Sequence, residues 1–158
     1  MSKSIRSDDT FHAFQGMMFP FFYMEIRRDN IVEDALNYLT KAETKNLKKP
    51  LKIKFANEQG IDEGGPQKEF FQLLVKQLFT PEYGMFHYFP DSRVFWPNAH
   101  SFEPNIKFEL IGILLGCAIF NGIILDIRFP GAVYKKLLNV PVDLQDMRQI
   151  KPDVVQNL

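Results

Sequence analysis

The chain has 158 residues, of which 46% are hydrophobic, and it carries 19 basic and 19 acidic residues for a formal net charge of +0. This length fits one domain or part of a larger one, and the apolar content is ample for a packed core. Because the chain lacks the basic excess of a nucleic-acid-binding or membrane-surface protein, we predict neither kind of partner. The single cysteine, Cys117, cannot form an internal disulfide, which favours a reducing, cytoplasmic location.

The amino-terminal part predicts a tail, a strand and a helix. Residues 1–19 read as a polar tail followed by a short apolar segment, without the apolar core of a signal peptide. Apolar and polar residues alternate over 22–27, which predicts a half-buried strand. Asn30 is expected to cap the next helix, with Glu33 as its capping-box partner.

The middle of the chain predicts a second strand, two helices and a hairpin. Alternation over 51–55 indicates a strand, and a helix is expected over 67–79, before the helix-breaking Pro81. Short aromatic runs on either side of Pro90-Asp91-Ser92 predict a β-hairpin. The apolar residues of 106–126 predict a long helix with no polar face, which is typical of an enclosed core helix. Its uncharged stretch is too short for a membrane span, so we expect no membrane partner.

The carboxyl-terminal part predicts three short helices. One begins at Pro130, one follows Asp143 as its cap, and one begins at Pro152. No repeat or internal linker interrupts the pattern. We therefore predict an α+β fold, a helix-rich single unit with a few short strands and a β-hairpin.

Catalytic and metal-binding chemistry is not indicated by the polar residues. Cys117 lies in the most apolar stretch without a basic neighbour that would activate a thiol, so we predict a structural role. His12, His87 and His100 lack metal-ligand spacing. We expect no metal and no cofactor.

The segment around residue 64 allows a functional and a structural interpretation. Asp62 and Glu63 could form a general acid/base pair, although acidic groups are also favoured near the start of a helix. Gly64-Gly65-Pro66 supplies a tight turn but lacks the ending of a phosphate-binding loop. We favour the structural interpretation for both.

Two longer motifs resemble one protein family. GIDEGGPQKEFF, at residues 60–71, resembles the GxDxGGxxxEFF signature of HECT-type ubiquitin-protein ligases. LIGILLGCAIFNGIILDIRFP, at 110–130, resembles that family's LIGxxLGxAIYNxxxLDxxFP. VYKKLLNVPVDLQDM, at 133–147, is most similar to the HERC branch. The resemblance implies that 20–158 form a partial HECT domain, the large subdomain of the amino-terminal lobe.

The resemblance also implies a function that this chain would perform only in part. HECT ligases accept ubiquitin from an E2 conjugating enzyme on a cysteine in a Thr-Cys-Phe context and pass it to a substrate lysine. These 158 residues contain no such tripeptide, so the resemblance places the family cysteine and the E2-docking subdomain beyond Leu158. We expect a structural scaffold that is inactive alone, with ubiquitin, an E2 enzyme and the remaining HECT subdomains as partners of the complete protein. The alternative is a non-catalytic binding module that holds ubiquitin or competes with an intact ligase.

Phe95 and Trp96 are the candidate binding residues. They fall in the predicted hairpin, near the surface that some HECT relatives use to hold ubiquitin non-covalently. As an exposed aromatic pair they could anchor ubiquitin. As core residues of the hairpin they need no partner.

Overall fold

A two-stranded parallel sheet lies at one end of the molecule. The computed structural model describes residues 20–58 and 64–157, so the predicted tail falls outside the described residues. Strand β1 (Phe22–Ile26) pairs with β2 (Leu51–Phe55), which sets Phe22 opposite Leu51 and Ile26 opposite Phe55. Both strands alternate buried and half-buried residues, as one-sided packing of a sheet requires. Both predicted strands are confirmed.

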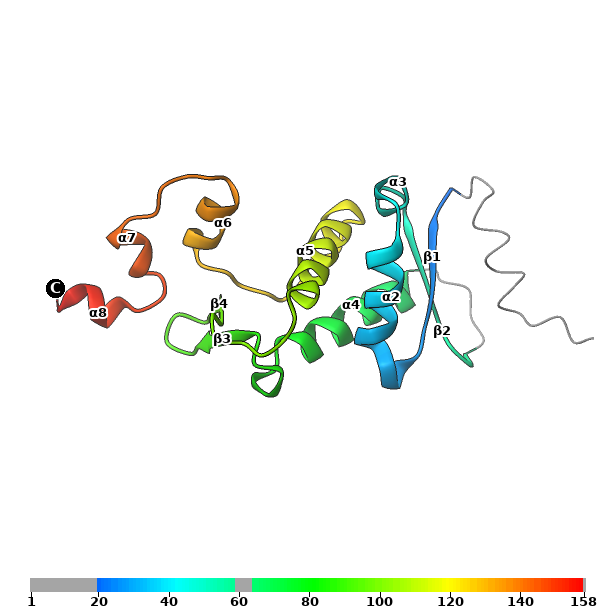
Figure 1. Cartoon of the computed structure of the whole chain (residues 1–158), viewed down its shortest axis with the longest axis horizontal. Coiled ribbons are helices and arrows are strands. Elements are labelled where there is room, and N and C mark those ends of the chain that lie inside the picture. The colour runs from blue at the N-terminus through cyan, green and yellow to red at the C-terminus, as the bar shows by residue number, and fades with distance from the viewer. Residues whose placement is uncertain (1–19, 59–63, 158) are drawn as a thin grey trace, which may run out of the picture.

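Helices cover one face of this sheet (Figure 1). The short helix η1 (Arg28–Asn30) leads into α2 (Ile31–Lys41), and α3 (Thr44–Leu47) precedes β2. Helix α4 (Gly65–Leu78) packs on β2 and α2, and α5 (Asn105–Phe120) packs on α2. Gly64, which precedes α4, adopts a left-handed conformation with a φ of 99°, and Pro66 lies in the first turn of the helix.

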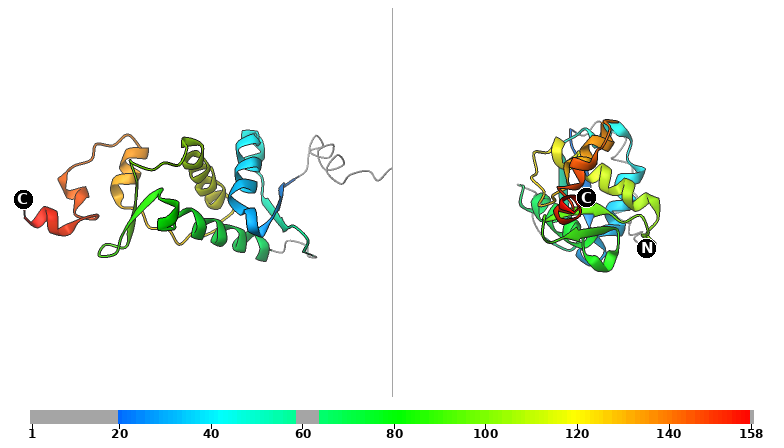
Figure 2. Two further views of the ribbon diagram at one scale, coloured as in Figure 1. Left: turned by 60° about the horizontal axis from the view of Figure 1, so that its bottom comes forward. Right: turned by 90° about the vertical axis from the view of Figure 1, so that its left-hand side faces the viewer.

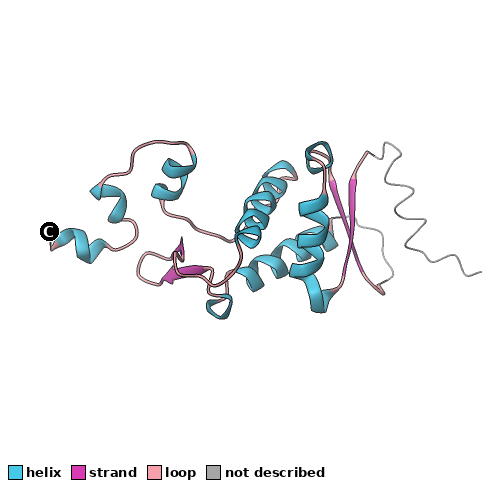
Figure 3. Ribbon diagram, in the orientation of Figure 1, coloured by secondary structure: helices cyan, strands magenta, loops and turns pink. Residues whose placement is uncertain are grey.

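The core forms between the sheet and these helices. Helices α4 and α5 both contribute to it, and the buried residues of α4 recur every three or four positions along the helix. The largest fully buried side chains include Met24, Ile26, Leu39, Ile53, Phe70, Phe71, Leu74, Leu78, Leu110 and Leu114. The mixture of helices and short strands (Figure 3) confirms the predicted α+β class.

The expected capping box at the start of α2 is wrong. Asn30 makes no side-chain capping bond, because η1 turns directly into α2 and the Asn30 backbone N–H already donates to Arg27 O at 3.2 Å. The Asn30 side chain instead donates to Asp34 Oδ1 at 3.4 Å. The Asn30 backbone N–H, which the pattern assigned to Glu33, is thus bonded to Arg27 O, and the Asn30 side chain contacts Asp34 without capping the helix.

The predicted hairpin is present and lies beyond α4 and α5. Helix η2 (Pro81–Tyr83) precedes β3 (Phe86–Phe89), which pairs antiparallel with β4 (Val94–Pro97). Arg93, in the turn, has a φ of 55°, which the short connection between the strands requires.

Helix α5 ends six residues before the expected boundary at 126, at Phe120. Gly122 adopts a left-handed φ of 66°, and Asn121 donates from its side chain to Cys117 O at 2.8 Å. The same side chain accepts from the Leu51 backbone N–H at 2.7 Å, which ties the helix end to β2. The prediction of an enclosed helix is also wrong, because Ile119 is 80% exposed.

The last three helices extend past the hairpin, away from the sheet (Figure 2). They are α6 (Gly131–Leu137), α7 (Leu144–Met147) and α8 (Pro152–Gln156). Asp143 caps α7 as predicted and forms a capping box with Asp146. Within the described part of the chain, no helix has the length and apolar character needed to cross a membrane.

Candidate functional site

The two predicted binding residues do not form a joint aromatic surface. Phe95 is half-buried, with its ring centroid 5.1 Å from that of Phe79 and 4.9 Å from that of Tyr88. Trp96 is half-buried and lies opposite His87. Because successive strand residues point to opposite faces, the two rings face apart. Ubiquitin binding by Phe95 and Trp96 therefore stays a prediction.

An aromatic cluster fixes the hairpin to the end of α4. The rings of Phe79 and Phe86 stack with a centroid distance of 4.4 Å and an interplanar angle of 18°. The ring centroid of Phe129, a residue that follows α5 in the chain, lies 6.0 Å from that of Phe79 and 5.9 Å from that of Phe86. Aromatic pairs in such geometries stabilise by about 0.5–1.5 kcal/mol beyond their burial. The cluster thus gives the hairpin a fixed position beside α4.

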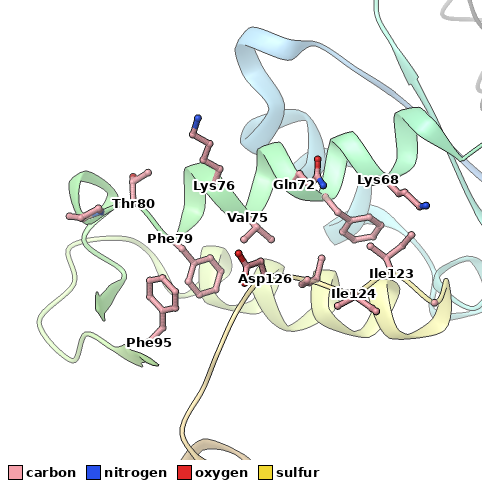
Figure 4. A pocket seen from close by; sticks show the side chains of 14 residues that line it. Lys68, Gln72, Val75, Lys76, Phe79, Thr80, Phe95, Ile123, Ile124 and Asp126 are labelled. Atoms are coloured by element: carbon pink, nitrogen blue, oxygen red, sulfur yellow. The ribbon is translucent and has the colours of Figure 1, made fainter. Parts of the chain in front are cut away.

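A groove of about 800 Å³ runs between α4 and residues 122–126, and we call it the α4 groove. Figure 4 shows Val75 and Phe79 pointing from α4 toward this segment. Lys68 and Lys76 also line the groove, and the Lys76 side chain points away from its floor (Figure 4). Its walls are therefore apolar and one rim is basic.

The chain that forms the second wall is drawn out between α5 and α6 (Figure 1). Side chains over 123–129 alternate between half-buried and exposed, with Ile124 97% exposed. This period of two is that of extended backbone. Within residues 20–58 and 64–157, no hydrogen bond involves the backbone of residues 124–127, whereas Arg128 O accepts from Phe95 N at 2.8 Å. The segment therefore resembles a strand edge without a partner.

A charged cluster joins Arg28 to Glu58, which follows β2, and to Glu69 of the glycine motif, which lies on α4. The Arg28 guanidinium donates to both carboxylate oxygens of Glu69, at 2.7 and 3.0 Å, and also to Glu58. It lies over the ring of Phe55, 3.9 Å from the centroid. These bonds lower the pKa of Glu69 and of Glu58 and raise the pKa of Arg28. Arg28 thus links the chain that follows β2 to helix α4.

The structure places Cys117 inside the fold. It is 5% exposed, and burial raises the pKa of its thiol above the ordinary value. Both features oppose formation of a reactive thiolate. The structural role of Cys117 stays a prediction, which its burial and its apolar neighbours both support.

The other predicted polar candidates are not brought together. His87 and His100 are exposed at separate places, and His12, Asp62 and Glu63 lie outside the described residues. Among the residues that the structure describes, no group of three or more His, Cys, Asp and Glu side chains could hold a metal ion.

Sequence reasoning missed the α4 groove and the Arg28 cluster. The groove had a signal, because apolar residues alternate from Ile123 to Phe129 directly after Gly122. The Arg28 cluster had none, because its carboxylates lie 30 and 41 residues further along the chain.

Comparison with known proteins defines the class of the chain. The profile of the HECT-domain (ubiquitin-transferase) family matches residues 72–158, which is more than half of the sequence. The chain belongs to the HECT family.

The relatives agree with the predicted HERC-like branch. The chain is 44% identical over 139 residues to the probable E3 ubiquitin-protein ligase HERC4 of Homo sapiens, with 88% of this chain and 13% of that protein aligned. For HERC3 of Homo sapiens the identity is 47% over 133 residues, which covers 84% of this chain and 13% of that protein. For HECTD2 of Homo sapiens the identity is 42% over 152 residues, which covers 87% of this chain and 20% of that protein. The chain thus spans between 13% and 20% of the length of these relatives.

Proposed function

We propose that the chain is the structural scaffold of a HECT-type E3 ubiquitin-protein ligase and does not itself carry ubiquitin. The observation that supports this most is the buried Cys117, whose thiol has a raised pKa, because it is the only cysteine in the sequence. The acceptor cysteine of the complete ligase would then come from another part of the HECT domain. Ubiquitin, an E2 enzyme and the remaining HECT subdomains are the proposed partners.

The scaffold provides rigid packing and needs no chemistry of its own. Phe70 and Phe71, from the glycine motif, are buried in the core, and Leu110 and Leu114 of the second motif belong to the same core cluster. Motif residues of this kind serve the fold. A ligase needs such a base because a transfer reaction depends on holding its reacting groups in a fixed geometry.

The chain should form no ubiquitin thioester. We expect no reducible adduct after incubation with activating enzyme, an E2 enzyme and ubiquitin, because a protonated, enclosed thiol cannot attack the E2 thioester. The measurement is a non-reducing gel with a parallel reduced lane, and Cys117→Ser is the matched control. An adduct that disappears on reduction and in Cys117→Ser would overturn the proposal.

A second candidate function is non-covalent binding of ubiquitin at the hairpin. It is favoured by a pocket of about 600 Å³ beside β3 that Phe95 lines together with the exposed Tyr88. We expect ubiquitin amide resonances to shift on addition of the chain, and Tyr88→Ala, at an exposed aromatic residue of this pocket, to weaken this binding at least about tenfold, as loss of an aromatic anchor does. Phe102→Ala, at an exposed loop residue, is the control. Unshifted resonances would contradict this function while leaving the scaffold proposal intact.

A further inference from the structure

We propose that the α4 groove binds an extended peptide segment that pairs with residues 124–127 as an added β-strand and directs acidic side chains toward the lysines of α4. This interaction goes beyond the scaffold function and does not require ubiquitin transfer.

The unpaired backbone is the first argument. Within the described ranges, the N–H and C=O groups of 124–127 make no hydrogen bond, and backbone groups of that kind are a template for strand addition. An extended peptide supplies a donor and an acceptor at matching spacing. A docked α-helix bonds its own backbone internally and would leave these groups unpaired. The groove therefore suits a strand better than a helix.

The walls of the groove define which side chains the added strand carries. Val75 and Phe79 form one apolar wall, and Ile123 and Leu125 form the other. Ile124 stands 97% exposed beside them. Side chains of a strand alternate between two faces, so every second residue of the peptide is apolar and lies against these walls.

The positive charge at the rim of the groove determines which residues the peptide should carry at its outward-facing positions. Lys68 and Lys76 line the groove from α4, and no ion pair joins either lysine to a carboxylate among the residues placed by the structure. Asp126 is the acidic residue among the lining residues. The two lysines thus outnumber it, and charge complementarity favours glutamate or aspartate at the outward positions of the peptide.

A synthetic peptide tests this inference on the full 158-residue chain. A strand rises about 3.3 Å per residue, so a peptide of about eight residues spans 124–127 with free ends. The probe alternates isoleucine or valine with glutamate and threonine and carries a fluorophore. Two isomers of it carry N-methyl groups on all odd or all even residues.

We expect the unmethylated peptide to bind, as measured by fluorescence anisotropy, and to slow hydrogen exchange at the amides of residues 124–127. A strand donates to its neighbour through alternate residues only. One methylated isomer should therefore lose binding and the other should keep it. Absence of binding, or equal binding by both isomers, would overturn the inference.

Matched variants locate the site. Lys76→Glu and Ile124→Ser should each weaken peptide binding at least about tenfold. Both positions are exposed, so these variants should fold. Lys48→Glu and Leu138→Ser make the same changes at exposed positions outside the groove and should bind normally. The inference would also be overturned if the two control variants weakened peptide binding equally. It would be overturned too if sedimentation showed the chain associating with itself in place of binding the peptide.

Discussion

Replacing Phe70 by alanine should lower the free energy of unfolding by about 3–5 kcal/mol, in the range measured for buried phenylalanines. Phe70 is 0% exposed, and its ring packs edge-on to Phe71 at a centroid distance of 5.4 Å. It lies on α4, which packs against both β2 and α2. Removal of the ring leaves a cavity that neighbouring side chains from several elements cannot close together.

The measurement is urea unfolding followed by circular dichroism, with the loss seen as a lower midpoint at an unchanged slope. Gln77→Ala, at an exposed position of the same helix, should stay within about 0.5 kcal/mol of the parent chain. If Phe70→Ala lowered the free energy of unfolding no more than Gln77→Ala does, core packing would not be the role of the phenylalanines in the glycine motif.

Local patterns in the sequence were sufficient for the strands and the hairpin. Phe22, Met24 and Ile26 alternate with polar residues, and a period of two requires a one-sided strand whatever the rest of the fold does. Asp143 likewise capped a helix as predicted, because its capping partner Asp146 lies three residues away. In each case, the residues that decide the structure are close in sequence.

The end of α5 and the α4 groove depend on distant residues. An apolar run such as 106–126 cannot be divided into helix and extended chain by hydrophobicity alone. The division at Asn121 is fixed by its bond to Leu51, 70 residues earlier in the chain. The groove needs the extended segment to lie beside α4, which only the tertiary structure places there. HECT membership was readable from the motifs because they carry the family's buried residues.

Replacing Asp34 by asparagine should lower stability at neutral pH by about 1.5–3 kcal/mol, the usual contribution of a hydrogen-bonded charged group. Asp34 is 8% exposed. Its Oδ2 accepts from Arg27 N at 2.9 Å and Arg27 Nε at 3.0 Å, and its Oδ1 accepts from Arg27 Nη2 at 2.6 Å. The asparagine side chain has one acceptor oxygen where the carboxylate has two. The variant therefore loses the charge and some of the hydrogen bonds from Arg27.

The loss should depend on pH in a definite direction. Burial alone would raise the pKa of Asp34, but the bonds from Arg27 outweigh it and hold the pKa below the ordinary value. A carboxyl group with a depressed folded pKa binds more protons in the unfolded state, so its stabilisation is complete above the unfolded pKa of about 3.9. It disappears as the pH falls through the folded pKa.

The gap between the parent chain and Asp34→Asn should therefore be largest near neutral pH and should narrow below about pH 4. Urea midpoints measured across this range test it. Glu43→Gln is the control, because Glu43 pairs with Lys45 at the exposed surface and such pairs contribute little. A gap that stays constant with pH would show that the asparagine is costly for its shape alone, and that the Arg27 bonds do not depend on the charge of Asp34.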